Sequence, residues 1–187
     1  MSQQDDSRRG DVLVVIDVLN DFEHEDGELL LESLRTRHEG LLGALDEARN
    51  AGLPVVYVND HLGGWNADRA ALIERARRGK GGEFLKALAP RPSEPLLIKG
   101  RYSAFDHTAL ELLLRELNAE RILLAGSSTE GCIVQSGIDA RELGFKVTIL
   151  TDACLTVDSD RERTALRYAR EIGGIFLEPQ VDLARSR

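Results

Sequence analysis

The chain has 187 residues, of which 42% are hydrophobic and 30% are charged, and its formal net charge is −8. This length and composition predict a soluble globular protein with one core, in a single domain that spans residues 1–187. The negative charge argues against nucleic acid or an acidic membrane surface as a partner, because both attract positively charged proteins. No apolar run has the length of a membrane span, and the first residues lack the pattern of a secretory signal.

Apolar runs and helical patterns alternate along the chain. Short apolar runs predict strands at residues 11–17, 54–59, 95–99, 121–126 and 145–150. Between them, the spacing of leucines and alanines predicts helices through 41–48, near 67–78 and 83–88, through 110–117, after Cys132 and near 160–172, and a GIFLEP segment follows the last helix. Strands that alternate with helices predict an α/β fold. We expect three α/β/α layers, with a mostly parallel sheet of five to six strands covered by helices on both faces.

Reactive side chains follow several of the predicted strands. Asp17 ends the first strand, Lys99 ends the third, and Cys132 follows the fourth. In parallel sheets the functional crevice lies beyond the carboxyl ends of the strands, so we expect these three side chains to meet at one edge. Arg101 and Tyr102 follow the third strand and are candidate substrate contacts. Arg101 either binds a substrate carboxylate as a bidentate fork or pairs with a surface carboxylate.

The stretch GSSTEGC, residues 126–132, places a cysteine between a strand and a helix. Ser127 followed by Glu130 has the spacing of a capping box, which predicts that the helix begins between them. Cys132 then lies in the first helical turn, where the dipole and unpaired N–H groups favour a thiolate. The Glu130 charge raises the thiol pKa unless it points away. In the alternative interpretation, Cys132 is a small buried hydrophobic residue.

Other uses of this loop are excluded by single residues. Cys132 and Ile133 stand where a P-loop requires Lys and Ser or Thr. Glu130 stands where the nucleophile elbow of a serine hydrolase requires a second glycine. The only other cysteine is Cys154. Two cysteines do not imply a disulfide framework, and free thiols are typical of a reducing cytoplasm, which is the expected location.

Three stretches in this order resemble the isochorismatase-like cysteine hydrolases, a superfamily that includes nicotinamidases, N-carbamoylsarcosine amidohydrolase and ureidoacrylate hydrolases. They are VVIDVLNDF (14–22), IKGRYSAF (98–105) and AGSSTEGCIVQSGIDARELGF (125–145). The resemblance extends to the TDAC segment (151–154) and is specific for the superfamily, not for a substrate. It implies an Asp17–Lys99–Cys132 triad on a three-layer α/β fold, in which Asp17 accepts the thiol proton and Lys99 holds both anions.

The resemblance also implies which residues around the triad bind the substrate. A cis peptide bond is expected between Ser127 and Ser128, with the N–H groups of Ser128 and Cys132 directed at the substrate oxygen. Phe22 and Trp65 correspond to aromatic pocket walls in relatives. Association into a homo-oligomer, either a dimer or a tetramer, is frequent in the superfamily and is expected here.

Two departures from the superfamily concern the substrate and a metal. Leu19 stands where relatives often have glutamine. Nicotinamidases build a metal site from an Asp and a His two residues later, together with further histidines. Here Asp60 and His61 are adjacent, Leu62 occupies the second position, and the next histidine is His107. We therefore expect no catalytic metal and no other cofactor, and nicotinamidase activity is not favoured.

The proposed chemistry depends on the pKa values of Asp17 and Cys132. A free thiol titrates near about 8.5 and an aspartate near about 3.9, so the two values must approach each other before Asp17 can act as the base. We expect Lys99 and the helix N-terminus to lower the thiol pKa, and burial to raise the pKa of the carboxyl. The two groups would then share one proton and titrate as a unit.

These observations favour a hydrolase that cleaves a C–N bond of a small amide, carbamoyl or ureido compound through a thioester acyl-enzyme. A second hypothesis is hydrolysis of a vinyl ether such as isochorismate. Relatives with that activity rely on the aspartate and do not need the thiol, so Cys132 argues mildly against it. A third is a non-catalytic binding module that retains the triad from an ancestral enzyme. The presence of all three residues argues against such a loss of catalysis.

Overall fold

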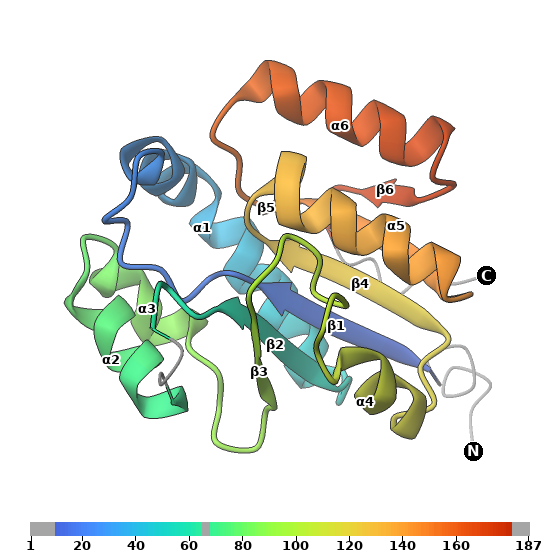
Figure 1. Ribbon diagram of the computed structural model, residues 1–187, viewed down its shortest axis with the longest axis horizontal. Helices are drawn as coiled ribbons and strands as arrows, with labels where there is room; N and C mark the ends of the chain where they lie inside the picture. The colour runs from blue at the N-terminus through green and yellow to red at the C-terminus, as the bar shows by residue number, and fades with distance from the viewer. Residues whose placement is uncertain (1–9, 65–67, 181–187) are drawn as a thin grey trace.

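The computed structural model describes residues 10–64 and 68–180 of the chain. Within those ranges, six parallel strands form one sheet in the order β3-β2-β1-β4-β5-β6 (Figure 1). The strands are β1(Asp11–Ile16), β2(Val55–Asp60), β3(Leu96–Lys99), β4(Arg121–Gly126), β5(Lys146–Cys154) and β6(Phe176–Glu178). The chain builds the sheet outward from β1 to β3, returns to the centre, and then builds outward from β4 to β6. The predicted α/β class with a parallel sheet is confirmed.

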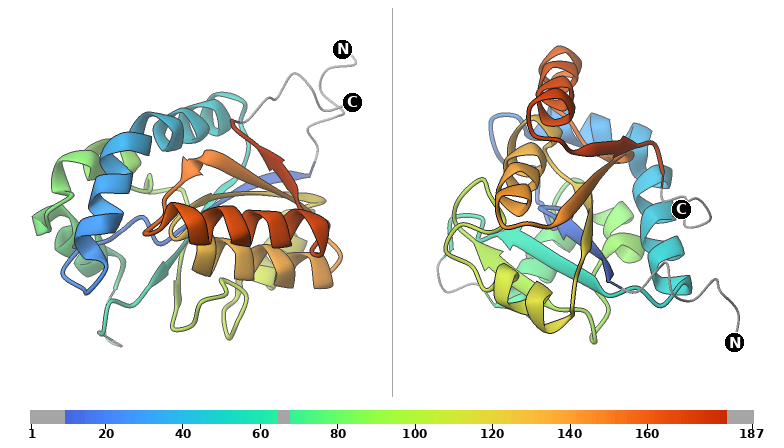
Figure 2. Two further views of the ribbon diagram at one scale, coloured as in Figure 1. Left: turned by 90° about the horizontal axis from the view of Figure 1, so that it is seen from above. Right: turned by 90° about the vertical axis from the view of Figure 1, so that its right-hand side faces the viewer.

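Helices cover both faces of the sheet (Figure 2). They are α1(Gly27–Asn50), α2(Arg69–Arg78), α3(Gly82–Leu88), α4(Leu110–Glu116), the π-helical turn η1(Thr129–Ile133), α5(Val134–Glu142) and α6(Ser159–Glu171). Side chains of β1 alternate between two apolar cores, because successive residues of a strand point to opposite faces. Leu13 and Val15 pack with α1, α2 and α3, whereas Val14 and Ile16 pack with α4, α5 and α6. The three-layer arrangement follows from this alternation.

Helix α1 begins much earlier than the sequence pattern predicted, at Gly27 instead of near residue 41. Leu30, Leu31 and Leu34 are buried on the same side of the sheet as Leu41 and Leu45, so they extend one apolar stripe. Charged residues between these leucines obscured the helical spacing. A helix of 24 residues therefore replaces most of the loop that was expected after the first strand.

Strand β5 continues past its predicted end at residue 150 as far as Cys154. A register shift between Leu124 and Gly126 lets Cys154 pair with Gly126 at the end of β4. Asp152 consequently lies within the strand and is exposed. No helix within the described ranges is long and apolar enough to cross a membrane.

Candidate active site

The site lies where the direction of the chain across the sheet reverses, between β1 and β4. Such a switch point opens a crevice beyond the carboxyl ends of the strands, because the flanking connections run to opposite sides. Asp17 directly follows β1 and has a φ angle of +52°, in the left-handed region that Asp tolerates better than most residues. Cys132 lies in η1, after β4, and Lys99 ends β3. The three residues expected at this edge therefore come from three strand ends.

The Lys99 ammonium joins the other two side chains. Its Nζ lies 2.7 Å from Oδ2 of Asp17 and 3.3 Å from Sγ of Cys132. It also donates to the carbonyl oxygen of Arg101 at 2.8 Å. The other carboxylate oxygen of Asp17, Oδ1, accepts a hydrogen bond from the backbone N–H of Asp60 at 2.7 Å. The carboxylate is thus held at both oxygens, and its charge also acts on the Cys132 thiol.

Burial and mutual charge set the protonation of the two acidic groups. Loss of water raises the pKa of Asp17 above its usual value, and the neighbouring Lys99 ammonium opposes this rise. For Lys99, whose side chain is only 2% exposed, burial acts to lower the pKa. The negative charges of Asp17 and Cys132 prevail, and the pKa of Lys99 is raised. The lysine therefore remains an ammonium, and the predicted increase in the pKa of the carboxyl is confirmed.

The prediction of a lowered thiol pKa is wrong. The pKa of Cys132 is raised to about 12, first because the half-buried thiol is poorly solvated and then because the Asp17 carboxylate faces it. Lys99 lowers the value as expected but does not compensate for both effects. Release of the thiol proton to solvent is therefore unfavourable at neutral pH. Transfer of that proton to Asp17 is a different step, because it creates no additional charge inside the site.

The turn that carries Cys132 is tied closely to the end of β1. Gly126 has a φ of +118°, and a Cβ there would lie 2.0 Å from the carbonyl oxygen of Ile16, so only glycine allows this approach. The N–H of Ser127 donates to that same oxygen at 2.8 Å. The hydroxyl of Ser127 donates to the carbonyl oxygen of Asp17 at 2.9 Å. The peptide bond between Ser127 and Ser128 is cis, at the position that the resemblance implies.

The helix does begin between Ser127 and Glu130, but the predicted capping box is wrong. The N-cap is Ser128, which makes no side-chain capping bond, and the Ser127 hydroxyl is used by Asp17. The turn is π-helical, with the N–H of Ile133 donating to the Ser128 carbonyl at 3.1 Å; such turns are frequent at functional sites. The Glu130 carboxylate accepts from the N–H of Val157 at 2.9 Å and therefore bonds away from the thiol.

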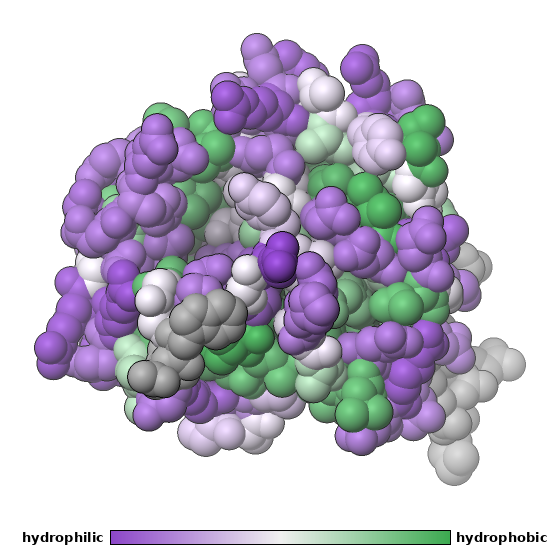
Figure 3. All heavy atoms as spheres, viewed as in Figure 1, coloured by the Kyte–Doolittle hydropathy of each residue, from purple (hydrophilic) through white to green (hydrophobic). Residues whose placement is uncertain are grey.

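A cavity of about 1030 Å³ opens over the three residues and includes Asp17, Lys99 and Cys132 in its lining. Arg101, Tyr102 and Arg161 also line it, and Tyr102 is 73% exposed. The face shown in Figure 3 is hollowed near its centre, and hydrophilic residues predominate around the hollow. The cavity is large enough for a small metabolite and its polar lining suits a polar one.

The fold agrees with comparisons to known proteins. A family model described as the Isochorismatase domain matches residues 11–180. The chain belongs to the isochorismatase family.

Relatives of this isochorismatase family member include two bacterial proteins at 30% identity. The isochorismatase family protein YaaI of Bacillus subtilis is 30% identical over 156 residues, which cover 83% of this chain and 86% of YaaI. Maleamate amidohydrolase of Pseudomonas putida is 30% identical over 155 residues, which cover 79% of this chain and 72% of the relative. The crystal structure of an isochorismatase family protein from Desulfovibrio vulgaris superposes with a TM-score of 0.73 at 27% identity, covering 91% of this chain and 94% of that one.

In this isochorismatase family member, Phe22 does not form the wall of the cavity that the resemblance implied. Phe22 is buried in the core with α1, α2 and α3, and its ring lies so close to Gly81 that a Cβ there would approach it to 2.3 Å. The residues that line the cavity do not include Phe22. The backbone of Phe22 is left-handed, with a φ angle of +60°, where its side chain turns into the core. Trp65 lies outside the described residues.

The residues that stand at the metal position of nicotinamidases are engaged in a turn. Oδ1 of Asp60 accepts from the N–H of Leu62 at 2.7 Å, and Nδ1 of His61 accepts from the N–H of Gly63 at 2.9 Å. Leu62 supplies no donor atom for a metal from its side chain. These residues do not fit the nicotinamidase metal site, and the absence of a catalytic metal stays a prediction.

Two buried polar residues that support the site were not singled out from the sequence. The side-chain amide of Asn59 accepts from the N–H of Leu19 at 2.9 Å and donates to the carbonyl of Leu19 at 3.0 Å, which anchors the loop after β1. The hydroxyl of Ser136 accepts from the N–H of Ala104 at 2.8 Å and donates to the carbonyl of Cys132 at 2.6 Å. A signal was present, since Ser136 follows Cys132 by one helical turn.

Proposed function

We propose that this protein is a cysteine hydrolase that cleaves a C–N bond in a small amide, carbamoyl or ureido compound through a thioester acyl-enzyme. The observation that carries the proposal is the position of the Lys99 ammonium, 2.7 Å from the Asp17 carboxylate and 3.3 Å from the Cys132 sulfur. A nucleophile beside a base, with a cation to hold the charge, is the arrangement that nucleophilic catalysis requires.

In the first step the thiol proton passes to the Asp17 carboxylate. The site then holds a thiolate, a neutral carboxylic acid and the Lys99 ammonium, so its net charge does not change. The raised pKa of Asp17 favours this acceptance, whereas the raised thiol pKa, about 12, keeps the thiol protonated until the transfer. Substrate in the cavity would displace water and strengthen the attraction between thiolate and ammonium.

In the second step the thiolate forms a bond to the carbonyl carbon, and the carbonyl π electrons move to oxygen. The backbone N–H groups of Ser128 and Cys132, in the turn after β4, are the proposed donors to this oxyanion. The C–N bond then breaks as Asp17 returns its proton to the departing nitrogen. The amine leaves, and a thioester joins the acyl group to Cys132.

In the third step water cleaves the thioester. Asp17 takes a proton from the water as the oxygen bonds to the acyl carbon, and the C–S bond breaks to release the acid. The thiolate takes back the proton that Asp17 received from the water, and the enzyme returns to its starting state. None of the three steps consumes an oxidant or a cofactor.

Amide and ureide substrates are supported by the relatives. One relative is maleamate amidohydrolase at 30% identity, and another is ureidoacrylate amidohydrolase of Cronobacter sakazakii at 26% identity over 171 residues.

Among the described residues, Arg101 and Arg161 line the cavity without an ion-pair partner, whereas Asp21 in the same lining is paired with Arg75. We therefore propose that Arg101 binds a carboxylate of the substrate, since a guanidinium matches a carboxylate in geometry.

A screen for ammonia release from primary amides, carbamoyl compounds and ureides tests the proposal. The wild-type protein should turn over at least one class, and Cys132→Ala should abolish that turnover. Cys154→Ala is the matched control, because Cys154 is fully buried away from the cavity and should retain activity. Full turnover by Cys132→Ala would contradict the mechanism. Cleavage of isochorismate that persists in Cys132→Ala would favour the vinyl-ether hypothesis, and no turnover by the wild type would favour a binding module.

Two further expectations concern the protein as a whole. A homo-oligomer and a cytoplasmic location remain predictions from the resemblance and from the free thiols. Sedimentation equilibrium of the purified chain tests the first, and fractionation of the source cells tests the second.

A further inference from the structure

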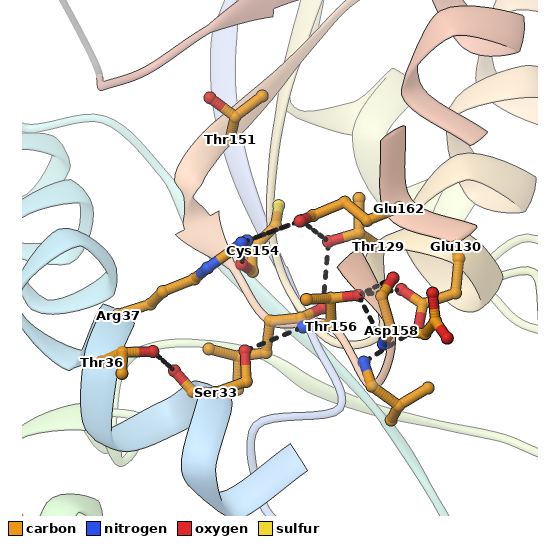
Figure 4. A network of polar contacts seen from close by, with 12 residues as sticks. Ser33, Thr36, Arg37, Thr129, Glu130, Thr151, Cys154, Thr156, Asp158 and Glu162 are labelled. Atoms are coloured by element: carbon orange, nitrogen blue, oxygen red, sulfur yellow. Dashed lines mark hydrogen bonds and ion pairs between the residues drawn. The ribbon is translucent and has the colours of Figure 1, made fainter. Parts of the chain in front are cut away.

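A partly buried ion pair lies behind the turn that carries the nucleophile. Glu162, in the first turn of α6, is 7% exposed. Arg37 of α1 binds it in a bidentate manner, with Nη1 2.6 Å from Oε1 and Nη2 2.8 Å from Oε2 (Figure 4). Nη1 of Arg37 also donates to the carbonyl of Cys154 at 2.7 Å. These bonds join α1, the end of β5 and α6 at one point.

The ion pair reaches the nucleophile turn through Thr129. The hydroxyl of Thr129 lies 3.0 Å from Oε1 of Glu162 and 3.0 Å from the carbonyl oxygen of Leu155. The N–H of Thr129 donates to that same carbonyl at 2.8 Å. Thr129 is completely buried and is the first residue of η1. The network therefore ends three residues before Cys132, within the same single turn of helix.

A second set of contacts fixes the position of the neighbouring segment, residues 154–156. Oγ of Ser33 accepts from the N–H of Thr156 at 3.0 Å, and Oε2 of Glu130 accepts from the hydroxyl of Thr156 at 2.9 Å. Ser33 and Arg37 are four residues apart and so lie on one face of α1. This face binds the segment 154–156 twice, and that segment together with Glu162 binds the start of η1.

Stability alone is a weak reason for this arrangement. An ion pair gains little over well-packed apolar residues when it is buried, because removing both charges from water costs about as much as their attraction supplies. It also gains little where it is exposed, because water and salt screen the charges. What a bidentate pair supplies in addition is a fixed direction for its hydrogen bonds. Here one of these hydrogen bonds reaches Thr129, the first residue of η1. The same turn carries Cys132, whose sulfur must face the Asp17 and Lys99 side chains.

We propose that Glu162, held by Arg37, is a positioning residue that orients the Cys132 turn through Thr129. This inference rests on the proposed function, because positioning matters only if the thiol reacts. A small displacement of the sulfur relative to Asp17 and Lys99 slows both proton transfer and attack. Binding of substrate in the cavity should be affected much less.

The test compares four full-length variants with the wild type. Glu162→Gln removes the charge, Thr129→Val removes the hydroxyl with little change in shape, and Thr129→Ser restores the hydroxyl. Glu94→Gln is the matched control, because Glu94 forms an equally bidentate pair with Arg49, at 2.8 Å for each bond, with side chains 9% and 6% exposed. Glu94 does not line the cavity. Each variant is measured for kcat, KM, thermal midpoint and the rate at which iodoacetamide alkylates Cys132.

Glu162→Gln and Thr129→Val should lower kcat by about tenfold or more, with a much smaller change in KM, and should change the alkylation rate of Cys132. Thr129→Ser should recover most of kcat. Glu94→Gln should lower the thermal midpoint while leaving kcat and alkylation at wild-type values.

If Glu162→Gln does not fold, the comparison of Thr129→Val with Thr129→Ser tests the inference. Folded Glu162→Gln or Thr129→Val with wild-type kcat and alkylation would overturn the inference. If the wild type turns over no C–N substrate, the proposed function fails, but the alkylation rates still test the positioning.

Discussion

The Lys99 ammonium lies 2.7 Å from Oδ2 of Asp17, on a side chain that is only 2% exposed. Two opposite charges at this distance, largely shielded from water, depend on each other, because neither is well solvated alone. The sulfur of Cys132 lies 3.3 Å from the same ammonium. Removal of any one of the three groups should therefore change the protonation of the other two.

Replacement of Lys99 by methionine should greatly slow turnover and raise the pKa of Asp17 further. The methionine preserves most of the side-chain volume but leaves the buried carboxylate without its cation. We expect kcat to fall by about 10²–10³-fold, as when one electrostatic stabiliser of a transition state is lost. Steady-state kinetics on the substrate from the ammonia-release screen measures the loss. Retention of more than half of kcat would show that Lys99 has no part in the reaction.

Replacement of Asp17 by asparagine should have opposite effects on turnover and on thiol acidity. Turnover should fall by about 10²–10⁴-fold, because the proton acceptor and donor is lost. The pKa of Cys132, about 12 in the wild type, should fall, because the Asp17 carboxylate is one of the causes that raise it and Lys99 remains to lower it. Alkylation of Cys132 by iodoacetamide as a function of pH reports this pKa. An unchanged or higher thiol pKa in Asp17→Asn would contradict the assigned geometry.

The dependence of kcat/KM on pH should have an acid limb and no alkaline limb near the pKa of a free thiol. Activity requires the ionised carboxylate, so it should be lost as the pH falls through the pKa of Asp17, which burial raises above 3.8. At higher pH, Lys99 stays protonated because its pKa is raised above 10.5, and the thiol keeps its proton until about 12. A rate that instead rises through about pH 8–9 would indicate a thiol that ionises directly to solvent.

Replacement of Asn59 by leucine should destabilise the fold as well as the site. Asn59 is 1% exposed, and its amide satisfies both the N–H and the carbonyl of Leu19. Two buried backbone groups would lose their partners, so the free energy of unfolding should fall by roughly 2–5 kcal/mol. Urea denaturation measures the difference. Asn50→Ala, at an exposed position on the last turn of α1, is the control and should change the free energy by less than about 0.5 kcal/mol.

The alternation of apolar runs with helical patterns was sufficient to predict the class of fold. A short continuous apolar run such as residues 11–16, which the structure buries on both faces, is typical of a covered parallel sheet. Where polar residues interrupt the pattern, the prediction failed. The first half of α1 was missed because charged residues separate Leu30, Leu31 and Leu34 from the leucines that follow. The end of β5 was missed because a change in register, which depends on the neighbouring strand, extends it.

The candidate catalytic residues were predictable, whereas their electrostatics and surroundings were not. Strand ends and a family resemblance were enough to select Asp17, Lys99 and Cys132. The thiol pKa was predicted in the wrong direction, because it depends on burial of the sulfur and on the distance to a carboxylate. The direction in which Phe22 points was also beyond the sequence, since a left-handed backbone and the close approach of Gly81 turn it into the core.

By itself, then, the sequence determined the order of strands and helices, the edge of the sheet that carries the reactive groups, and the family to which the chain belongs. These depend on local periodicity and on residue types at strand ends, which are readable along the chain. Only the tertiary structure decided which of those groups touch, how far each is removed from water, and that Arg37 and Glu162 lie behind the Cys132 turn. Contacts between residues separated by up to 125 positions, as in that pair, arise from packing and leave no local pattern.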